Sequence, residues 1–454
     1  MKYLFTMANK TFAFTLILLF VSSFSQAQKN TDSPYSRYGI GTLSTTGFNG
    51  NFGLSGGGIA WRPFQYKPLI YDSLSRSNAN IRDRGSNFIN IVNPASMSNV
   101  SLTTFEFSAV SRNAQYTSNG QSRTGSHTQF GHMSLGIPLG EKAGFAVGIK
   151  PFSFVGYDYA NSTIIEDDGE GEAVNYVYEG SGGVNEIFFG VGYEFLKNFS
   201  VGATGSYYFG QLIDDRRVVY DDQSSGLMNS LDERKTIVNS LGYKLGVQYF
   251  KHLNDDYRFV AGATISPIEE LNAERTRIFR NYTGAEGTEN FRDTALFEGN
   301  RKITVATAAV VGIGVAFEKK TKWMLTADLK MNNWGDGSEQ LSSGIEAGNG
   351  QSINIGFDKY SNTSTFGSYF GKIGYRAGVR YNTSIIRIEN EDVTEFGISF
   401  GLSLPLRKNF STLNFGAEVG QRGKDEGGLT KENFFNLQVG VTINDKWFIK
   451  RQYD

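Results

Sequence analysis

The chain has 454 residues and a formal net charge of −1, from 44 basic and 45 acidic residues, so its charge gives no reason to expect a nucleic-acid partner. It contains no cysteine, which excludes disulfides, thiolate metal sites and the class of lipoproteins that carry their lipid on a cysteine. Glycine is frequent (54 residues), proline is scarce (8 residues), and aromatic residues make up 14% of the chain, a composition that favours sheet and turns over helices.

The first residues have the pattern of a secretory leader. Lys2 and Lys10 supply positive charge, an apolar stretch runs over 12–24, and Ser-Gln-Ala follows at 25–27 as a cleavage region. We therefore expect residues 1–27 to be a signal peptide. The alternative is a membrane-anchoring helix, but such a helix needs about 20 apolar residues and this stretch is shorter.

From about residue 100 onward, apolar and polar residues alternate. In 437–443, Leu, Val, Val and Ile occupy every second position, and Gln, Gly and Thr lie between them. The stretches 241–249, 375–381 and 413–419 have the same period. Side chains on a strand point alternately to its two faces, so each stretch predicts a strand with one apolar and one polar face.

This alternation fits a soluble β-sandwich or a lipocalin as well as a membrane barrel, and three features favour the barrel. The strands run about ten residues, which is the length of a tilted membrane strand. The polar face is rich in glycine and carries charges suited to a wet lumen, while aromatic residues gather at strand ends. The charges are Lys150, Glu194, Arg376, Arg380 and Glu418, and the aromatic residues are Tyr207, Phe209, Tyr249, Trp447 and Phe448.

Short and long connections alternate along the predicted strands, as periplasmic turns and outer loops do in such barrels. Short turns are expected at 140–142, 197–198, 318–320 and 407–409, and long polar loops near 156–184, 212–237, 268–302 and 422–433. Clear strands are expected at 102–112, 129–138, 143–155, 185–196, 199–211, 238–250, 257–267, 303–317, 322–332, 369–382, 394–404, 410–421 and 434–443. A weaker strand at 350–358 places both termini in the periplasm. The sequence thus predicts an all-β fold, a transmembrane antiparallel β-barrel of about 14 strands over 101–454.

Residues 28–100 do not alternate. They contain a glycine cluster at 53–58, scattered aromatic residues, and Asn-Pro-Ala at 93–95. A barrel of this size has room inside, because about eight strands already fill their interior with side chains. We therefore expect 28–100 to form an N-terminal plug, or hatch, in the lumen.

The order of a leader, a Gly-rich segment, Asn93-Pro94-Ala95 and then a barrel resembles the FadL/TodX family of outer-membrane transporters for hydrophobic compounds. The stretches 33–41 (SPYSRYGIG) and 446–451 (KWFIKR) resemble the Bacteroidota branch of that family. The resemblance implies a fourteen-stranded barrel with an N-terminal hatch. It also implies a cell outer membrane location.

Candidate ligand contacts lie in the predicted plug. The residues are Phe48, Phe52, Ile59, Trp61 and Phe64, and for each of them packing within the plug is the alternative. Asn93, Pro94 and Ala95 are expected to fix the hatch turn, since Pro locks φ and Asn suits a turn.

No catalytic constellation is found in the sequence, and we expect neither an enzyme nor a cofactor or metal. The histidines at 127, 132 and 252 lack metal-ligand spacing, and we expect His132 to be a solvated lumen residue. The stretch 53–57 matches the hydrolase G-x-S-x-G pattern, but no strand–turn–helix setting surrounds it.

Two functional hypotheses follow. The first is a passive transporter that captures a hydrophobic molecule, such as a long-chain fatty acid, and releases it laterally through a gap in the barrel wall. The second is a binding or assembly component of a protein secretion system, similar to the type IX system, in which long outer loops grip a protein. An outer-membrane enzyme and a general pore are weaker alternatives. The expected partners are outer-membrane lipid and a hydrophobic ligand, without nucleic acid, and we expect a monomer.

Overall fold

The computed structural model describes residues 31–44, 47–63, 88–167, 170–220, 227–267, 270–285, 287–333, 345–347, 349–361, 368–388, 391–406 and 411–445. The predicted signal peptide and the aromatic residues at 447 and 448 lie outside these residues. Within the described part of the chain, no helix is long and apolar enough to cross a membrane.

Fourteen antiparallel strands form a closed ring, in which the last strand pairs with the first. The ring strands are β2 (Thr103–Ser118), β3 (Gln121–Pro138), β4 (Ala143–Asp167), β5 (Glu170–Leu196), β6 (Phe199–Tyr220), β7 (Asn229–His252), β8 (Tyr257–Ser266), β11 (Ala309–Lys319), β12 (Trp323–Asn333), β14 (Gly350–Lys359), β15 (Gly374–Ile388), β16 (Glu391–Pro405), β17 (Thr412–Arg422) and β18 (Lys431–Asp445). The predicted fourteen-stranded barrel is confirmed, and the strand expected at 350–358 is β14.

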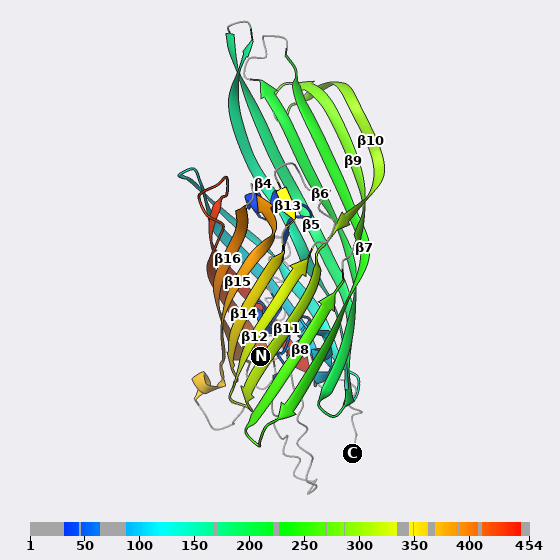
Figure 1. Cartoon of the computed structure of the whole chain (residues 1–454), viewed down its shortest axis with the longest axis vertical. Helices are drawn as coiled ribbons and strands as arrows, with labels where there is room; N and C mark the ends of the chain where they lie inside the picture. The colour runs from blue at the N-terminus through cyan, green and yellow to red at the C-terminus, as the bar shows by residue number, and fades with distance from the viewer. Residues whose placement is uncertain are drawn as a thin grey trace, which may run out of the picture.

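The ring is much taller on one side, as Figure 1 shows. Strands β4 to β7 are 22 to 27 residues long, whereas β11, β12 and β14 have 10 or 11 residues. A hairpin of β9 (Glu270–Thr283) and β10 (Asn290–Ala306) continues this tall side, because β9 pairs with the upper half of β7. We call the upper parts of β4 to β7, together with β9 and β10, the extracellular wall.

Several long loops predicted from the sequence are therefore wrong. Most of 156–184, 212–237 and 268–302 is strand and belongs to the extracellular wall. The predicted strand 303–317 is two strands, since β10 ends at Ala306 and β11 begins at Ala309. The predicted strand 369–382 begins instead with a 3-10 turn, η5 (Tyr369–Lys372). Only the connection near 422–433 is mostly loop, between β17 and β18.

The outward face of the ring is apolar and open, as a lipid-facing surface must be. Leu241 is 77% exposed, and Phe189, Ile313 and Phe400 on other strands are more than half exposed. An aromatic row of Tyr257, Phe317, Trp323 and Phe357 borders this belt, with neighbouring ring centroids 5.4 to 6.4 Å apart. A soluble protein does not leave such a belt uncovered, and the belt places the barrel in the outer membrane.

The described residues of the N-terminal region, 31–63 and 88–100 without 45–46, lie inside the ring, and we call them the lumen segment. They form η1 (Pro34–Arg37), β1 (Thr42–Leu43), α2 (Asn49–Phe52) and η2 (Pro94–Asn99). Their hydrogen bonds reach inward-facing groups on well-separated strands, including Gln248 on β7, Asp358 on β14 and Thr442 on β18. The segment thus touches several sides of the barrel interior.

Glycines on the inner face let this segment approach the wall closely. A Cβ at Gly202 of β6 would lie 2.3 Å from the carbonyl carbon of Pro94, and one at Gly246 of β7 would lie 2.1 Å from Oδ1 of Asn93. Neither position can hold a side chain without a shift of the η2 turn. The glycine on the polar face of these strands therefore makes space for packed backbone rather than water.

Candidate functional site

The hydrogen-bonded ring of strands is open between β3 and β4 over part of its height. These strands pair only low in the barrel, from Met133 opposite Ile149 to Pro138 opposite Gly144. Above that level, β3 continues to pair with β2 and β4 continues to pair with β5. An opening in the hydrogen-bonded wall, which we call the seam, therefore runs upward from Met133.

The local sequence accounts for the seam. Gly131 is the extra residue where the β2–β3 register shifts, just before paired contact with β4 begins. On the other side, Pro151 stands two residues beyond Ile149 and has no N–H to donate to a neighbouring strand. A second register shift follows at once in β4, where Phe152 is the extra residue. Bulges and proline end strand pairing, so the two strands separate here.

The lumen segment occupies the seam. Its strand β1 pairs with the free edge of β4, with Thr42 opposite Phe154 and Leu43 opposite Ser153. On the β3 side, the Asp32 carboxylate lies 2.8 Å from Nε2 of His127. The β1–β4 pairing and the Asp32–His127 contact therefore hold the stretch 32–43 between the separated strands, in place of the missing β3–β4 ladder.

A cavity of about 450 Å³ lies beside this stretch. Its lining includes Ile40, Leu43, Ile91, Val310 and Phe434, so a large part of it is apolar. A site of this size and mixture is typical of a small-molecule pocket.

The cavity also has a marked excess of positive charge. Six basic side chains line it, and they are Arg112, Lys150, Lys244, Lys330, Arg380 and Arg422. Glu395 and Glu432 are the carboxylates in the same lining. Glu395 pairs with Arg380, which also binds Glu418 at 3.0 Å. The excess of cations over carboxylates in the lining gives the cavity the chemistry to hold a carboxylate or another oxyanion beside apolar surface.

The predicted ligand contacts Phe48, Phe52, Ile59 and Trp61 do not line this cavity. Each is at most 3% exposed and packs between the lumen segment and the wall. Phe48 stacks on His132 with centroids 3.9 Å apart, and Nε1 of Trp61 donates to Asp358 at 3.0 Å. They contact a ligand only if the segment moves, so their predicted role stays a prediction. Phe64 lies outside the described residues.

The Asn93-Pro94-Ala95 motif begins the η2 turn. The side chain of Asn93 accepts a hydrogen bond from the N–H of Ala95 at 3.0 Å, which is an N-cap, and Pro94 occupies the first helical position. The same amide donates to the carbonyls of Ile59 at 2.9 Å and Val247 at 3.0 Å. The motif thus joins two parts of the lumen segment to strand β7.

The charges predicted for a wet lumen are mostly paired and buried. Arg376 binds Asp358 at 3.2 Å, Lys150 binds Glu186 at 2.6 Å, and Glu194 binds Arg62 at 3.5 Å. The expectation that His132 is solvated is wrong, because this residue is 1% exposed. Its Nδ1 lies 2.7 Å from Ser108 Oγ, and its other nitrogen lies 3.4 Å from Glu106. The sequence suggested a solvated lumen, whereas the lumen segment packs against several of these groups.

Sequence reasoning named two of the cavity cations, Lys150 and Arg380, as lumen charges and missed the other four. Arg112, Lys244 and Lys330 all stand on the polar face of alternating strands, so the signal that could have found them was present. What the sequence could not show is how high each one stands in the barrel. That height decides whether a cation meets the lumen segment or the cavity above it.

The family model for BamG matches residues 7–63 and 80–454. The chain belongs to the BamG family. No curated protein matches this BamG-family chain.

Solved structures share the fold. A Pseudomonas aeruginosa FadL homologue has a TM-score of 0.55 at 11% identity, covering 89% of this chain and 99% of its own. The CymD monoaromatic hydrocarbon channel has a TM-score of 0.52 at 12% identity, covering 88% and 98%. A deletion variant of the TodX monoaromatic hydrocarbon channel has a TM-score of 0.50 at 15% identity, covering 78% and 94%. The predicted FadL-like fold is confirmed, while the Bacteroidota branch stays a prediction.

Proposed function

We propose that this protein is a passive outer-membrane channel for hydrophobic small molecules that carry an anionic group, such as long-chain fatty acids. The observation that carries the proposal is the position of the cavity. It lies against the stretch 38–44, which fills the seam between β3 and β4, so a displaced stretch would connect the cavity to the side of the barrel. Two of the structurally similar proteins, CymD and TodX, are monoaromatic hydrocarbon channels, which supports the same class of cargo.

The chemistry of the cavity suits such a molecule. Apolar residues can hold a hydrocarbon tail, and basic side chains of the lining such as Lys330 and Arg112 can hold a carboxylate. The route needs no catalytic step and no cofactor, because a ligand can move down its own gradient. In this proposal the lumen segment acts as the plug, and it opens at the seam rather than leaving the barrel.

A disulfide across the seam tests the proposal. The chain has no cysteine, so the pair Leu43→Cys/Ser153→Cys introduces the only two thiols, at directly opposed positions of β1 and β4. We expect uptake of radiolabelled oleate by cells to fall at least about tenfold when the pair is oxidised, and to recover on reduction.

The matched control places a disulfide between the paired strands β2 and β3, so that it does not bridge the seam. Thr117→Cys/Ser122→Cys joins opposed positions at the top of the β2–β3 hairpin, where the native hydroxyls are 2.9 Å apart. Its oxidation is expected to leave uptake unchanged. Equal uptake by the oxidised and reduced seam variants would count against a lateral route, and no oleate uptake by the wild-type protein would count against the channel itself.

A second candidate is a protein-binding role, as in the assembly component considered from the sequence. The extracellular wall favours it, because a sheet that rises this far above the membrane on one side is not needed to enclose the cavity.

A further inference from the structure

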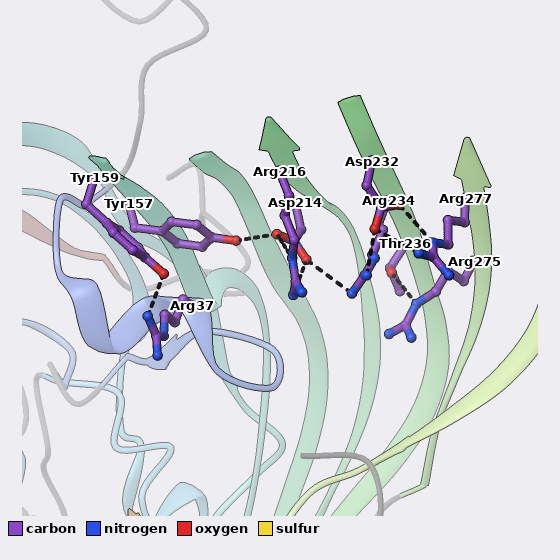
Figure 2. Close-up of polar contacts among 10 residues, drawn as sticks. All are labelled: Arg37, Tyr157, Tyr159, Asp214, Arg216, Asp232, Arg234, Thr236, Arg275 and Arg277. Atoms are coloured by element: carbon purple, nitrogen blue, oxygen red, sulfur yellow. Dashed lines mark hydrogen bonds and ion pairs between the residues drawn. The ribbon is translucent and has the colours of Figure 1, made fainter. Parts of the chain in front are cut away.

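The inner face of the extracellular wall carries a row of arginines. They are Arg216 on β6, Arg234 on β7, Arg275 and Arg277 on β9, and Arg301 on β10. Figure 2 shows the first four on one face of neighbouring strands, the face on which Arg37 of the lumen segment meets Tyr159. We call these five residues the arginine row.

The row contains like charges in direct opposition. Arg275 is the cross-strand partner of Arg301, and Arg277 is the cross-strand partner of Arg234. Like charges at opposed positions of a sheet repel and destabilise it. A sequence selected only for a stable wall would not place four arginines in two such pairs.

A carboxylate neutralises the Arg234–Arg277 pair, whereas the Arg275–Arg301 pair has no carboxylate bound to it among the described residues. Asp232 takes two hydrogen bonds from Arg277, at 2.7 and 3.0 Å, and also binds Arg234 at 2.7 Å. By contrast, Arg275 donates only to the hydroxyl of Thr236, at 3.2 Å, among the described residues. Arg301 has no hydrogen bond or ion pair in the described part of the chain, and its side chain is exposed.

The electrostatic consequence is visible at Arg275. Partial desolvation, together with the neighbouring guanidinium groups of Arg234 and Arg301, lowers the pKa of Arg275. These strands stand above the apolar belt, outside the membrane-spanning part of the barrel. An anion placed between Arg275 and Arg301 would remove the repulsion that the free protein carries.

The composition of the face points to a macromolecular partner. Every cation of the row is Arg, and the next positions along it hold Tyr157, Tyr159 and Tyr178. Tyr157 donates to Asp214 at 2.8 Å, and Asp214 in turn binds Arg216, so the tyrosines and the row form one surface. Arg and Tyr are enriched in protein interfaces, where Lys is depleted.

The length of the row selects an extended anion over a small one. The row crosses four neighbouring strands, which at about 4.8 Å per strand is about 15 Å. One carboxylate or phosphate can engage only one or two guanidinium groups. An extended peptide places alternate side chains about 7 Å apart, so acidic residues at every second position match the length of the row.

We propose that the arginine row is a docking surface for an extended acidic segment of a partner protein, with the uncompensated Arg275–Arg301 pair at its centre. The segment lies across the inner face of the wall, above the mouth of the barrel. Its carboxylates bind the arginines, and its backbone lies against the tyrosines. This role is independent of the channel function proposed above.

The test uses the full-length protein in detergent micelles and a fluorescent peptide that alternates Glu and Ser. The matched peptide has Gln in place of Glu. We expect the Glu peptide to bind and the Gln peptide not to bind, with affinity that falls as salt is raised. The variant Arg275→Gln/Arg301→Gln is expected to weaken binding at least about tenfold.

The control variant is Arg280→Gln. Arg280 lies on the same strand β9 but points to the outer face, where it binds Glu233 at 2.8 Å. Its substitution is expected to leave peptide affinity unchanged. An equal loss in both variants would show that general charge, and not the row, attracts the peptide, and would overturn the proposal.

Two further readouts complete the test. The thermal midpoint of the free Arg275→Gln variant should equal or exceed that of the wild type, since a repulsion is removed. A clear fall would assign Arg275 a purely structural role and contradict the proposal. Full competition by oleate at equal concentration would also overturn it, because a single headgroup would then satisfy the row.

Discussion

The membrane-spanning part of the ring and the extracellular wall differ in how their arginines are neutralised. Inside the ring, arginines face carboxylates, as Arg258 faces Glu318 at 2.6 Å and Arg376 faces Asp358 at 3.2 Å. In the wall, Arg275 faces Arg301. The ring encloses its charges where an unpaired ion costs several kcal/mol, whereas the wall stands in water and can leave charges uncompensated. Neutralisation inside the ring stabilises the fold, and the lack of it in the wall leaves charge available for a partner.

The largest expected effect comes from breaking a ring pair. Glu318 is fully buried, binds Arg258 and accepts a hydrogen bond from Tyr360 at 2.6 Å. Glu318→Ala should therefore lower the free energy of unfolding by about 3–5 kcal/mol, because it removes the carboxylate that neutralises the buried Arg258. Urea unfolding of the refolded barrel measures this. The double variant Arg258→Met/Glu318→Leu should lose much less, and an equal loss would show that packing, not charge, dominates.

A smaller effect is expected from the close approach of the lumen segment to the ring. Gly202→Ala should cost about 1–3 kcal/mol, since the added methyl group overlaps the backbone at Pro94 and displaces the η2 turn. Gly205 on the same strand β6 has nothing within 4 Å of an added Cβ, so Gly205→Ala is the matched control and should change little. The same urea experiment compares the two. Equal stability of both variants would mean that the segment does not press against this strand.

The smallest expected effect is a pH dependence in the wall. On its outer face, partial burial and the carboxylates of Glu233 and Glu179 raise the pKa of Asp215 to about 6. An unfolded Asp titrates near 3.9, so between about pH 4 and 6 the folded wall binds more protons than the unfolded chain. This residue therefore makes the wall less stable as pH rises through that window. Thermal midpoints at pH 5 and pH 7.5 should differ less in Asp215→Asn than in the wild type, and an unchanged difference would contradict this assignment.

The sequence predicted the ring well and the wall poorly, for one physical reason. Strand β14 was found because Ile353, Ile355 and Phe357 face lipid while their neighbours face the lumen. Strand β9 has Arg275 on its inner face and Thr276 on its outer face, and water reaches both faces. A strand without lipid on one side lacks the regular apolar face that identifies a membrane strand. Its sequence therefore resembles that of a polar loop.

The seam and the cavity lay beyond the sequence for a different reason. The residues that create the seam, Gly131 and Pro151, are visible in the sequence, but their effect depends on standing opposite each other in neighbouring strands. The cavity combines side chains from the lumen segment and from strands far apart in the chain. Such a site depends on register, and a register follows from pairing rather than from any local pattern.

The contacts of the lumen segment also set an order of events during assembly. Asn49 donates to the carbonyl of Val441, 392 residues away along the chain, and Ser55 donates to Ser399. These bonds cannot form until the last strands have been delivered, yet the segment is made first. The segment that is synthesised first is thus among the last to reach its final contacts. These contacts can form only after the barrel has closed.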